Sequence, residues 1–557
     1  MAYAADLKSA GATHVGSTPT LPTRPRRHSR GLSEGDEQLS IERPEFRNED
    51  FLDFSKPENR QRMLDALALV ESKLGKEYRM VIGGKRVGAA DVLVSHNPSD
   101  WNQAISVFPK ATASMAVSAI EAASEAFAKW SRTSAEHRAG LVFKVADMLR
   151  ERRSVFSALM VYEVGKSWVE ADADTAEAID LIEFYGHEAL RYGGEQPLTR
   201  LSSERSELRY IPLGVGAVIP PWNFPVAIMM GMTVAAWAAG NTVVLKPSSD
   251  APTCAKWFIH LLEEAGLPPG VVNLVTGAGG EVGEVLVAHP MVRFISFTGS
   301  KEVGLRINEL AAHHQPEQIW IKRVVAEMGG KNAIVVDDEA DLDAAALGVM
   351  VSAYGFQGQK CSACSRAIVV NSIYDAFMEK LVTKAKAIKV GSPQDPGTYM
   401  GPVINPKAMA QILDYIEIGK REHTLVLGGS KIEGPGCLVE PTIFTKVDRD
   451  ATIAQEEIFG PVLAVIAAED FQDALDIGNC THYGLTGSVY STNAEKLAKA
   501  AEEFHVGNLY FNRKSTGAMV GAHPFGGFNM SGTDSKAGGR DYLLLFSQAK
   551  SISEKIA

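Results

Sequence analysis

The chain has 557 residues, of which 45% are hydrophobic and 22% charged, and its formal net charge is −11. This length is too great for one hydrophobic core and predicts two or three domains, and the composition is that of an ordinary soluble globular protein. The acidic balance argues against nucleic acid as a partner, because binding to a phosphate backbone requires a basic face.

The N-terminal segment is the first distinct part of the chain. It is rich in Ser, Thr, Gly, Pro and Arg and contains no apolar run, so we predict a disordered tail at residues 1–45. The basic segment 24–30 is a weak match to a transit peptide, because acidic residues follow it at once.

Helices and strands are predicted over the rest of the chain. Helical periodicity predicts helices at residues 116–130, 135–153 and 162–190. From residue 214 strands alternate with helices, and a second alternating series covers residues 332–511. Such alternation is typical of βαβ units in a doubly wound sheet. In the first series we expect strands at 214–219, 242–245, 271–275 and 294–298, and helices at 228–239, 252–265, 281–288 and 303–312.

The stretch between Tyr210 and Lys246 is uncharged and long enough to raise the question of a membrane span. Several prolines and Asn223 break it into pieces that are shorter than the roughly 20 apolar residues a crossing needs. We therefore predict a strand, a loop, a buried helix and a strand here, and no membrane contact.

Cys361 is the candidate nucleophile. It follows Gly355, Gly358 and Lys360, which supply a flexible approach and a cation beside the thiol. If a helix begins after Cys361, its positive end would favour the thiolate, which can attack a carbonyl carbon. The alternative is an inert buried cysteine that packs as a small hydrophobe. We expect the nucleophile to lie in a cleft between two α/β domains.

Five cysteines in so long a chain form neither a disulfide framework nor a zinc-ribbon pattern, which indicates a reducing compartment, the cytoplasm. Cys361 and Cys364 form a Cys-x-x-Cys pair. Because no second pair and no nearby His accompany it, we predict no metal site. Oxidation could still join the two sulfurs and silence the nucleophile.

Two strand ends carry candidate ligand-binding groups. Lys246 closes the strand at 242–245, and the carboxyl ends of parallel strands face the crevice where such sheets bind ligands; a solvated lysine is the alternative. Gly299, Ser300 and Gly304 lie between a strand and a helix, where backbone N–H groups can meet a phosphate. This pattern alone is weak in a chain with 50 glycines.

Two further polar side chains are candidates for catalysis. Asn223 stands between aromatic residues and prolines, a rigid setting from which an amide N–H can stabilise an oxyanion, although such an Asn is often structural. Glu327 precedes a Gly-Gly turn in apolar surroundings. A partly buried carboxylate has a raised pKa and can act as a general base, while a capping or paired glutamate is the alternative.

Taken in order, these motifs resemble the aldehyde dehydrogenase superfamily. The series is Trp-Asn-Phe-Pro, Lys-Pro-Ser, Phe-Thr-Gly-Ser, Glu-x-Gly-Gly-Lys, Gly-Gln-x-Cys and Glu-Glu-Ile-Phe-Gly-Pro-Val, and it covers about residues 50–550. The resemblance implies an α/β fold with a Rossmann-type NAD-binding domain at 46–325, a catalytic domain at 326–520 and a return to the first domain at 521–557. It also implies a small β oligomerisation flap, built from 190–211 and the C-terminal strand, and hence a homo-oligomer.

The resemblance also implies roles for individual residues. Cys361 would be the nucleophile, Asn223 and the Cys361 backbone N–H would form the oxyanion hole, and Glu327 would be the general base. Many members carry Glu where this chain has Ser249; that Glu disfavours a 2′-phosphate, so NADP use stays open beside NAD. The residues expected at the cofactor are Lys246 at the adenine ribose, Ser249, Gly277, Gly299, Ser300 at the pyrophosphate, Glu457 at the nicotinamide ribose and Phe459 against the nicotinamide.

Segments 358–363 and 509–521 are similar to the branch of the family that oxidises L-glutamate γ-semialdehyde, formed from 1-pyrroline-5-carboxylate, to L-glutamate in proline catabolism. In that branch Ser362, Gly517 and Ala518 would anchor the substrate α-carboxylate, and Phe224 and Phe525 would flank its aliphatic part. A Gly-rich loop with exposed N–H groups and aromatic walls suits such a substrate. Phe525 as plain core is the alternative.

Other functions are disfavoured by the same residues. A succinic semialdehyde dehydrogenase, or another member of the family, would lack an anchor for the α-carboxylate and ammonium groups. An inactive ligand-binding relative does not need Cys361, Glu327 and Asn223 together, and no His completes a hydrolase pair with Cys361. The chain lacks the length of a fused proline dehydrogenase domain, so we expect the monofunctional form and leave a transient contact with that enzyme open.

Overall fold

The computed structural model describes residues 43–556. Residues 1–42 of the predicted tail lie outside the described residues. Arg43, inside the predicted tail, is held in place: its guanidinium donates to Asp147 (2.8 Å) and to Glu183 (2.6 Å). Arg43 is therefore anchored on the helices that contain Asp147 and Glu183.

The first large sheet has seven strands in the order β11-β10-β7-β8-β9-β2-β3. Its five strands from β11 to β9 are parallel, while β2 and β3 are antiparallel additions. The chain runs outward from β7 in both directions, so the switch point lies between β7 and β10. The strands are β2 Met80–Ile82, β3 Lys85–Val87, β7 Val215–Ile219, β8 Thr242–Leu245, β9 Val272–Leu274, β10 Val292–Thr298 and β11 Arg323–Glu327.

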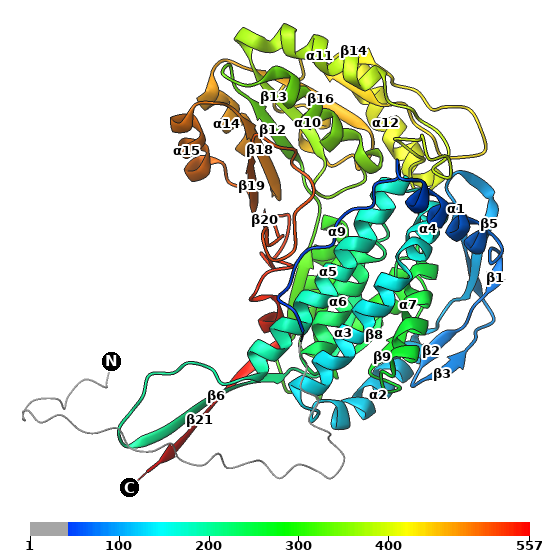
Figure 1. Cartoon of the computed structure of the whole chain (residues 1–557), viewed down its shortest axis with the longest axis vertical. Helices are drawn as coiled ribbons and strands as arrows, with labels where there is room; N and C mark the ends of the chain where they lie inside the picture. Colours follow the sequence, from blue (N-terminus) through cyan, green and yellow to red (C-terminus); the bar gives the residue numbers. More distant parts are fainter. Residues whose placement is uncertain (1–42, 557) are drawn as a thin grey trace, which may run out of the picture. The chain divides into compact units, whose positions relative to one another are not determined.

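Helices cover this sheet, as Figure 1 shows for α3, α5, α6 and α7. Strand β8 is buried along its whole length, as expected for a parallel strand covered on both faces. The helices are α2 Ala113–Trp130, α3 Ala135–Glu151, α4 Arg153–Glu163, α5 Trp168–Gly193, α6 Ala227–Ala238, α7 Pro252–Ala265, α8 Glu284–Ala288, preceded by a π-helical turn at Gly279–Gly283, and α9 Lys301–Ala312.

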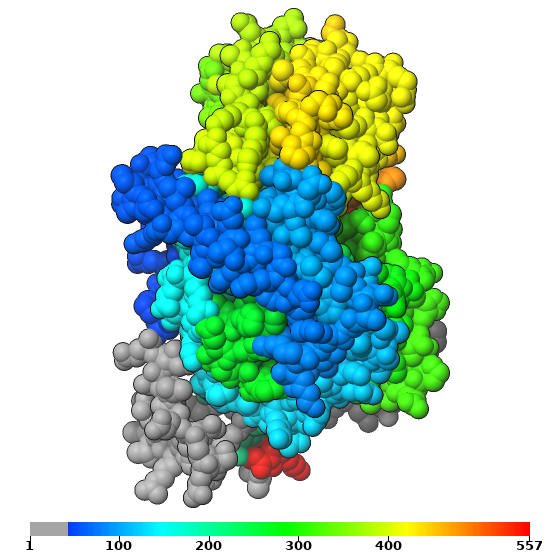
Figure 2. Space-filling view, turned by 90° about the vertical axis from the view of Figure 1, so that its right-hand side faces the viewer, coloured from blue at the N-terminus to red at the C-terminus, as the bar shows by residue number. Residues whose placement is uncertain are grey.

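An N-terminal layer lies against these helices. Figure 2 shows it in blue across one face of the molecule. Trp257 of α7 donates to the Tyr78 hydroxyl (3.1 Å), which ties this layer to the helices. The layer contains α1 Pro57–Glu71 and a three-stranded sheet in the order β1-β5-β4, with β1 Lys76–Glu77, β4 Val92–Asn97 and β5 Asp100–Pro109.

The second large sheet also has seven strands, in the order β14-β15-β16-β13-β12-β18-β19, and all except β14 are parallel. Its strands are β12 Asn332–Val336, β13 Cys364–Val370, β14 Thr424–Leu427, β15 Thr442–Thr445, β16 Val462–Ala468, β18 Thr486–Tyr490 and β19 Asn508–Phe511. Its helices are α10 Leu342–Tyr354, α11 Tyr374–Lys386, α12 Pro406–Glu422, α13 Thr452–Gln455, α14 Phe471–Asn479 and α15 Ala494–Glu503.

A separate two-stranded sheet pairs β6 Glu204–Pro212 with β21 Ser547–Lys555 in antiparallel register. Figure 1 shows this ribbon extending away from the helices. A 3₁₀ turn at Tyr542–Phe546 precedes β21, and the short strands β17 Tyr483–Gly484 and β20 Phe528–Asn529 form one more pair. Most residues of β6 and β21 are exposed or half-buried, so the ribbon presents open strand edges.

The uncharged stretch after Tyr210 folds as predicted, into the end of β6, strand β7, helix α6 and strand β8. Within residues 43–556 no helix has the length and apolar character that a bilayer crossing requires. One predicted helix is wrong: residues 162–190 are divided between α4 and α5 by a break at 164–167. Gly165 in this break has a positive φ of 71°. Glycine adopts this left-handed conformation without strain, and a right-handed helix cannot continue through it.

Candidate active site

The candidate site residues lie where the two large sheets face each other. Asn223 follows β7, Lys246 follows β8, Ser300 follows β10 and Glu327 ends β11, so all four stand at the carboxyl edge of the first sheet. Cys361, by contrast, precedes β13 at the amino edge of the second sheet. A parallel α/β sheet binds ligands at its carboxyl edge, and the second sheet brings the thiol to that edge.

The loop that carries Cys361 differs from the prediction. No helix begins after Cys361; strand β13 starts at Cys364 instead. Before it, Phe356, Gln357 and Gly358 form a turn with φ angles of 50°, 58° and 69°. Such left-handed backbone is strained for residues other than glycine, so the approach to Cys361 is a tightly shaped turn.

Asn332 fixes the backbone at and just after the candidate nucleophile. Its Nδ2 donates to the carbonyl oxygens of Cys361 (2.7 Å) and Ala363 (2.9 Å), and its Oδ1 accepts from the Thr486 N–H (2.9 Å). Asn332 begins β12 and Thr486 begins β18. The sequence motifs did not identify Asn332 as part of the site, although it follows the predicted Gly-Gly-Lys segment directly.

The thiol is not set up as a thiolate in this state. Burial raises the pKa of Cys361, and the carboxylates of Glu327 and Glu457 raise it further. The expectation of a lowered pKa was therefore wrong, because it rested on a helix N-terminus that is absent here. Removal of the thiol proton must accompany attack, so a nearby base is required.

Asn223 lies at the carboxyl end of β7 and is buried. Its Nδ2 donates to the Gln359 carbonyl oxygen (3.0 Å), two residues before Cys361. An amide nitrogen carries a second hydrogen, which this contact leaves available. The side chain is thus held beside the nucleophile loop with one donor free for an oxyanion.

Glu327 is shaped for proton transfer. Its Oε1 accepts from the Ser535 hydroxyl (2.6 Å), while its Oε2 has no hydrogen-bond partner within residues 43–556. Burial raises the pKa of Glu327 to about 8, and the Ser535 hydrogen bond opposes this rise. A carboxyl group with a pKa near the working pH is suited to general acid–base catalysis.

The segment around Glu457 crosses over the Gly-Gly turn. The Gly330 N–H donates to Glu457 Oε1 (2.9 Å), and a Cβ at Gly329 would lie only 2.0 Å from Glu457 Oε2. Only glycine allows this close approach. Burial raises the pKa of Glu457 to about 7. Phe459 has a positive φ of 55°, and its ring meets Trp222 edge-to-face at 5.6 Å.

The predicted cofactor residues line the edge of the first sheet. The Lys246 side chain is 5% exposed and its Nζ donates to the Pro247 carbonyl (3.3 Å); burial lowers the pKa of this ammonium to about 8. Ser300 caps helix α9, accepting from the Val303 N–H (3.4 Å). Gly277 is buried and Ser249 is exposed. A buried ammonium and a helix N-terminus suit ribose hydroxyls and a pyrophosphate.

Gly299 connects the edge that is expected to hold the cofactor to Glu327, the candidate base. Its N–H donates to the Glu327 carbonyl oxygen (3.1 Å), and a Cβ at Gly299 would lie 2.6 Å from the Phe297 ring. The backbone that would receive a pyrophosphate at α9 is therefore fixed to the backbone of Glu327.

Three of the predicted substrate residues, Ser362, Gly517 and Ala518, belong to segments that meet next to Cys361. Ser515 Oγ donates to the Ser362 carbonyl (3.3 Å), which brings the loop that contains Gly517 and Ala518 beside the nucleophile. Gly517 has a φ of 77°, and its carbonyl accepts from Arg513 (2.8 Å).

The two predicted aromatic walls have different surroundings. The Phe224 ring is half-buried and meets the Phe356 ring edge-to-face at 6.3 Å. The Phe525 backbone pairs with Ala537 in both directions (2.8 and 2.7 Å). Phe224 therefore packs directly on the turn before Cys361, while the backbone of Phe525 is held by a different loop.

Charged groups that the motifs did not reveal face the same site from helix α5. Lys360 forms an ion pair with Glu170 (2.7 Å). Burial raises the pKa of Glu177 to about 8, with Asp174 adding to the rise, and the Glu177 charge also acts on Cys361. These residues lie about 180 positions from Cys361, so no local pattern could have identified them.

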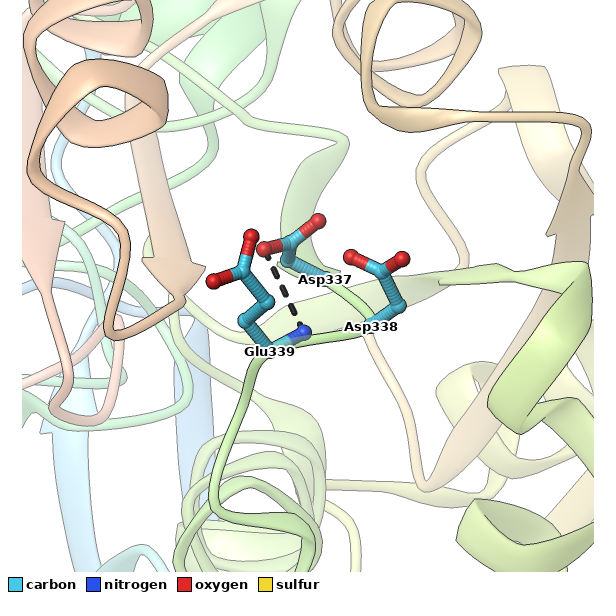
Figure 3. Close-up of side chains that lie close together, drawn as sticks. All are labelled: Asp337, Asp338 and Glu339. Atoms are coloured by element: carbon cyan, nitrogen blue, oxygen red, sulfur yellow. Dashed lines mark hydrogen bonds between the residues drawn. The ribbon is translucent and has the colours of Figure 1, made fainter.

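An acidic cluster lies away from this site, at the end of β12. Figure 3 shows Asp337, Asp338 and Glu339 with their carboxylates close together. Lys496 Nζ pairs with all three, at 2.7, 2.6 and 3.1 Å. This single ammonium offsets part of the negative charge of the cluster and occupies the space between the carboxylates.

The chain was compared with known protein families. Residues 87–552 match the aldehyde dehydrogenase family. This chain belongs to the aldehyde dehydrogenase family. The match covers most of the chain, and the α/β fold that the motifs predicted is confirmed by solved structures of the family.

Named relatives of this aldehyde dehydrogenase are similar over nearly the full length of this chain. A 1-pyrroline-5-carboxylate dehydrogenase of Geobacillus thermodenitrificans is 55% identical over 91% of this chain and 99% of its own. The solved 1-pyrroline-5-carboxylate dehydrogenase from Thermus with bound NAD is 50% identical, with a TM-score of 0.91 over 93% of this chain and 100% of its own. Proline utilization A from Bdellovibrio bacteriovorus is 45% identical, with a TM-score of 0.91 over 92% of this chain and 53% of its own.

Proposed function

We propose that this aldehyde dehydrogenase oxidises L-glutamate γ-semialdehyde, the open form of 1-pyrroline-5-carboxylate, to L-glutamate with NAD as the hydride acceptor. The observation that carries the proposal is the full-length similarity to proteins named 1-pyrroline-5-carboxylate dehydrogenase, at 55% identity over 509 residues. The arrangement of Cys361, Asn223 and Glu327 supports the chemistry, because the three groups can supply nucleophile, oxyanion donor and base.

The reaction begins at Cys361. Its sulfur adds to the aldehyde carbon while the thiol proton leaves to a base, and the free N–H of Asn223 with the Cys361 backbone N–H holds the oxygen that becomes negative. When bound, NAD supplies the acceptor for the hydride that leaves this carbon. Glu327 then takes a proton from water, whose oxygen attacks the acyl group on Cys361 and releases the acid. The pKa of Glu327, about 8, suits this step.

The residues at the edge of the first sheet fit the cofactor. The buried ammonium of Lys246 has a neutral carbonyl as its partner, so it can donate to a ribose hydroxyl, and the N-terminus of α9 after Ser300 offers N–H groups to a pyrophosphate. We assign Gly277 and Gly299 to the same edge. Glu457 and Phe459 would contact the nicotinamide half, since Glu457 lies over the Gly-Gly turn that follows Glu327 and Phe459 is two residues further along the same segment.

Ser249 decides how much NADP is accepted. It is exposed after β8, three residues beyond Lys246, and presents a hydroxyl where a carboxylate would repel a 2′-phosphate. We expect Ser249→Glu to lower kcat/KM for NADP at least about 10-fold more than for NAD, as like charges disfavour each other. Steady-state rates with each cofactor measure this ratio, and Ser249→Gln controls for size. An unchanged ratio in Ser249→Glu would place the 2′-phosphate elsewhere.

The carboxylate anchor sets the substrate preference. We expect Ser362→Ala to raise KM for L-glutamate γ-semialdehyde by about 10-fold, the value of one hydrogen bond to a charged group, and to change kcat little. The same variant should raise KM for succinic semialdehyde less, because the carboxylate of that aldehyde is one carbon closer to the reacting carbonyl than the α-carboxylate of L-glutamate γ-semialdehyde. Equal effects on the two substrates would contradict the assignment of Ser362, Gly517 and Ala518 as the anchor.

The substrate itself is tested by comparing kcat/KM for L-glutamate γ-semialdehyde and succinic semialdehyde in the unaltered protein. We expect the first to be preferred. The half-buried Phe224 and Phe525 would flank its methylene groups. A preference for succinic semialdehyde would replace the proposed substrate while keeping the family chemistry.

The assembly and location of the protein follow from other features. The exposed edges of the β6–β21 ribbon are suited to pair with strands of a second copy, so we propose a homo-oligomer. All five cysteines are free thiols, which fits a reducing compartment, and we propose the cytoplasm. We keep a transient contact with a proline dehydrogenase as a proposal, and likewise the domain boundaries at 46–325, 326–520 and 521–557.

A further inference from the structure

A fully buried ion pair lies in the break between α4 and α5, and the chemistry proposed above does not use it. Lys166 Nζ is 2.6 Å from Asp174 Oδ2, and both side chains are 0% exposed. A buried pair of this kind is a weak source of folding stability, since desolvation offsets the attraction. Its contacts therefore indicate what else it does.

One set of contacts leads to the loop of the oxyanion donor. The other oxygen of Asp174 accepts from the Ala227 N–H (2.6 Å), the first residue of helix α6. The Lys166 ammonium lies 3.8 Å from the centre of the Phe224 ring, next to Asn223 in the chain. The pair thus contacts the segment around Asn223 twice: the ammonium packs on the Phe224 ring, and the carboxylate accepts from a backbone N–H.

A second set of contacts leads to the loop of the nucleophile. The same ammonium lies 4.6 Å from the centre of the Phe356 ring, in the left-handed turn before Cys361. In that turn Gln357 Nε2 donates to the Gly165 carbonyl (3.0 Å), the residue beside Lys166. The Phe356 carbonyl accepts from the Gln359 N–H (2.9 Å), and the Gln359 carbonyl accepts from Asn223 (3.0 Å).

We propose that the Lys166–Asp174 pair is a positioning device that aligns Asn223 with Cys361. The ammonium contacts an aromatic ring from each loop, and cation–π contacts are directional and strengthen when water is excluded. Strained backbone such as the turn at Phe356 persists only where its surroundings hold it in place. The contacts of Lys166 and Asp174 hold both loops in place, so the Asn223 amide and the Cys361 sulfur keep a fixed position relative to each other. This inference rests on the roles proposed for Cys361 and Asn223.

The test variant is the double substitution Lys166→Met with Asp174→Asn, which removes both charges without leaving one buried alone. Asn at 174 retains an oxygen that can accept from Ala227 N–H. We expect kcat to fall on the order of 10²-fold, the cost of a misplacement of about 1 Å, while KM for aldehyde and NAD changes little. The matched control is Arg153→Met with Asp172→Asn, which removes another buried pair, at 2.6 Å between α4 and α5; we expect it to leave kcat near that of the unaltered protein.

A double-mutant cycle separates positioning from a merely structural role. In an Asn223→Ala background the donor is already absent, so the Lys166→Met, Asp174→Asn change should cost less than about threefold further, a strongly non-additive result. Additive losses, or an unchanged kcat in the charge-free variant, would overturn the inference. If that variant does not fold, Phe356→Leu takes its place, because it removes one of the two rings that the Lys166 ammonium contacts. We then expect a smaller loss in kcat and, again, a non-additive effect with Asn223→Ala.

The unaltered protein, assayed alongside, distinguishes the two proposals. Turnover of L-glutamate γ-semialdehyde by that protein upholds the proposed function, and the cycle then decides the role of Lys166 and Asp174. If another aldehyde is preferred, the proposed substrate fails while the cycle, run with that aldehyde, still decides the positioning role. Turnover of no aldehyde overturns both.

Discussion

Replacing Cys361 with serine should lower NAD-dependent oxidation of L-glutamate γ-semialdehyde by at least about 10⁴-fold, the scale on which loss of a covalent nucleophile acts. A serine hydroxyl is a far weaker nucleophile than a thiolate, and the carboxylates of Glu327 and Glu457 that raise the pKa of Cys361 would disfavour an alkoxide even more. Cofactor binding should persist, because Lys246 and Ser300 stand on the other sheet. NADH formation and NAD titration measure the two effects.

Two other cysteines serve as controls for this variant. Cys364 lies three residues away and is buried, with its thiol donating to the Arg366 carbonyl (3.3 Å), and Cys480 is exposed. We expect Cys364→Ser and Cys480→Ser to retain most of the activity. Loss of activity in Cys364→Ser with retention in Cys361→Ser would move the nucleophile to Cys364 and contradict the mechanism.

Replacing Glu327 with glutamine should lower kcat between about 10²- and 10⁴-fold, the range of general-base effects. The first turnover should still form NADH in a rapid burst, because Glu327 is assigned to the release of the acyl group rather than to its formation. Stopped-flow measurement of NADH separates the burst from the steady state. A steady-state rate equal to that of the unaltered protein would exclude Glu327 as the base.

The pH dependence of kcat should report the same group. Below its pKa of about 8 Glu327 is protonated and cannot accept a proton, so kcat should rise with pH and level off above about 8. Ser535→Ala removes a hydrogen bond that lowers this pKa, so the inflection should move to higher pH. Because the unshifted value for a glutamate is about 4.3, an inflection near that value would contradict the burial of the carboxyl group.

The sequence was sufficient to predict most elements of the first sheet. Strand β8 and helix α7 have the predicted bounds, 242–245 and 252–265, because short apolar strands and amphipathic helices are local patterns. The predicted ends of these strands also indicated that Lys246, after β8, and Ser300, after β10, lie at the same edge of the sheet, since the carboxyl ends of parallel strands meet there.

The features that were missed depend on contacts that no single local pattern contains. Helix α4 ends at Glu163, and Lys166 in the break beyond it pairs with Asp174 of α5, while Ser535 reaches Glu327 across 208 positions. The helix expected after Cys361 is absent, because a Gly-rich approach can lead into a strand as well as into a helix. The left-handed backbone at Phe356 could not be predicted either, because hydrogen bonds to Gly165 and Asn223, far away in the sequence, hold this turn in place.

The most direct test of the account is to trap the acyl group on the nucleophile. Glu327→Gln protein would be mixed with NAD and 1-pyrroline-5-carboxylate, quenched in acid, and examined by mass spectrometry of the intact chain and its peptides. The account predicts a mass increase of one glutamyl group, located on the peptide that contains Cys361 and absent when NAD is omitted. An adduct confined to another cysteine, or NADH formation with no adduct in the burst phase, would contradict it.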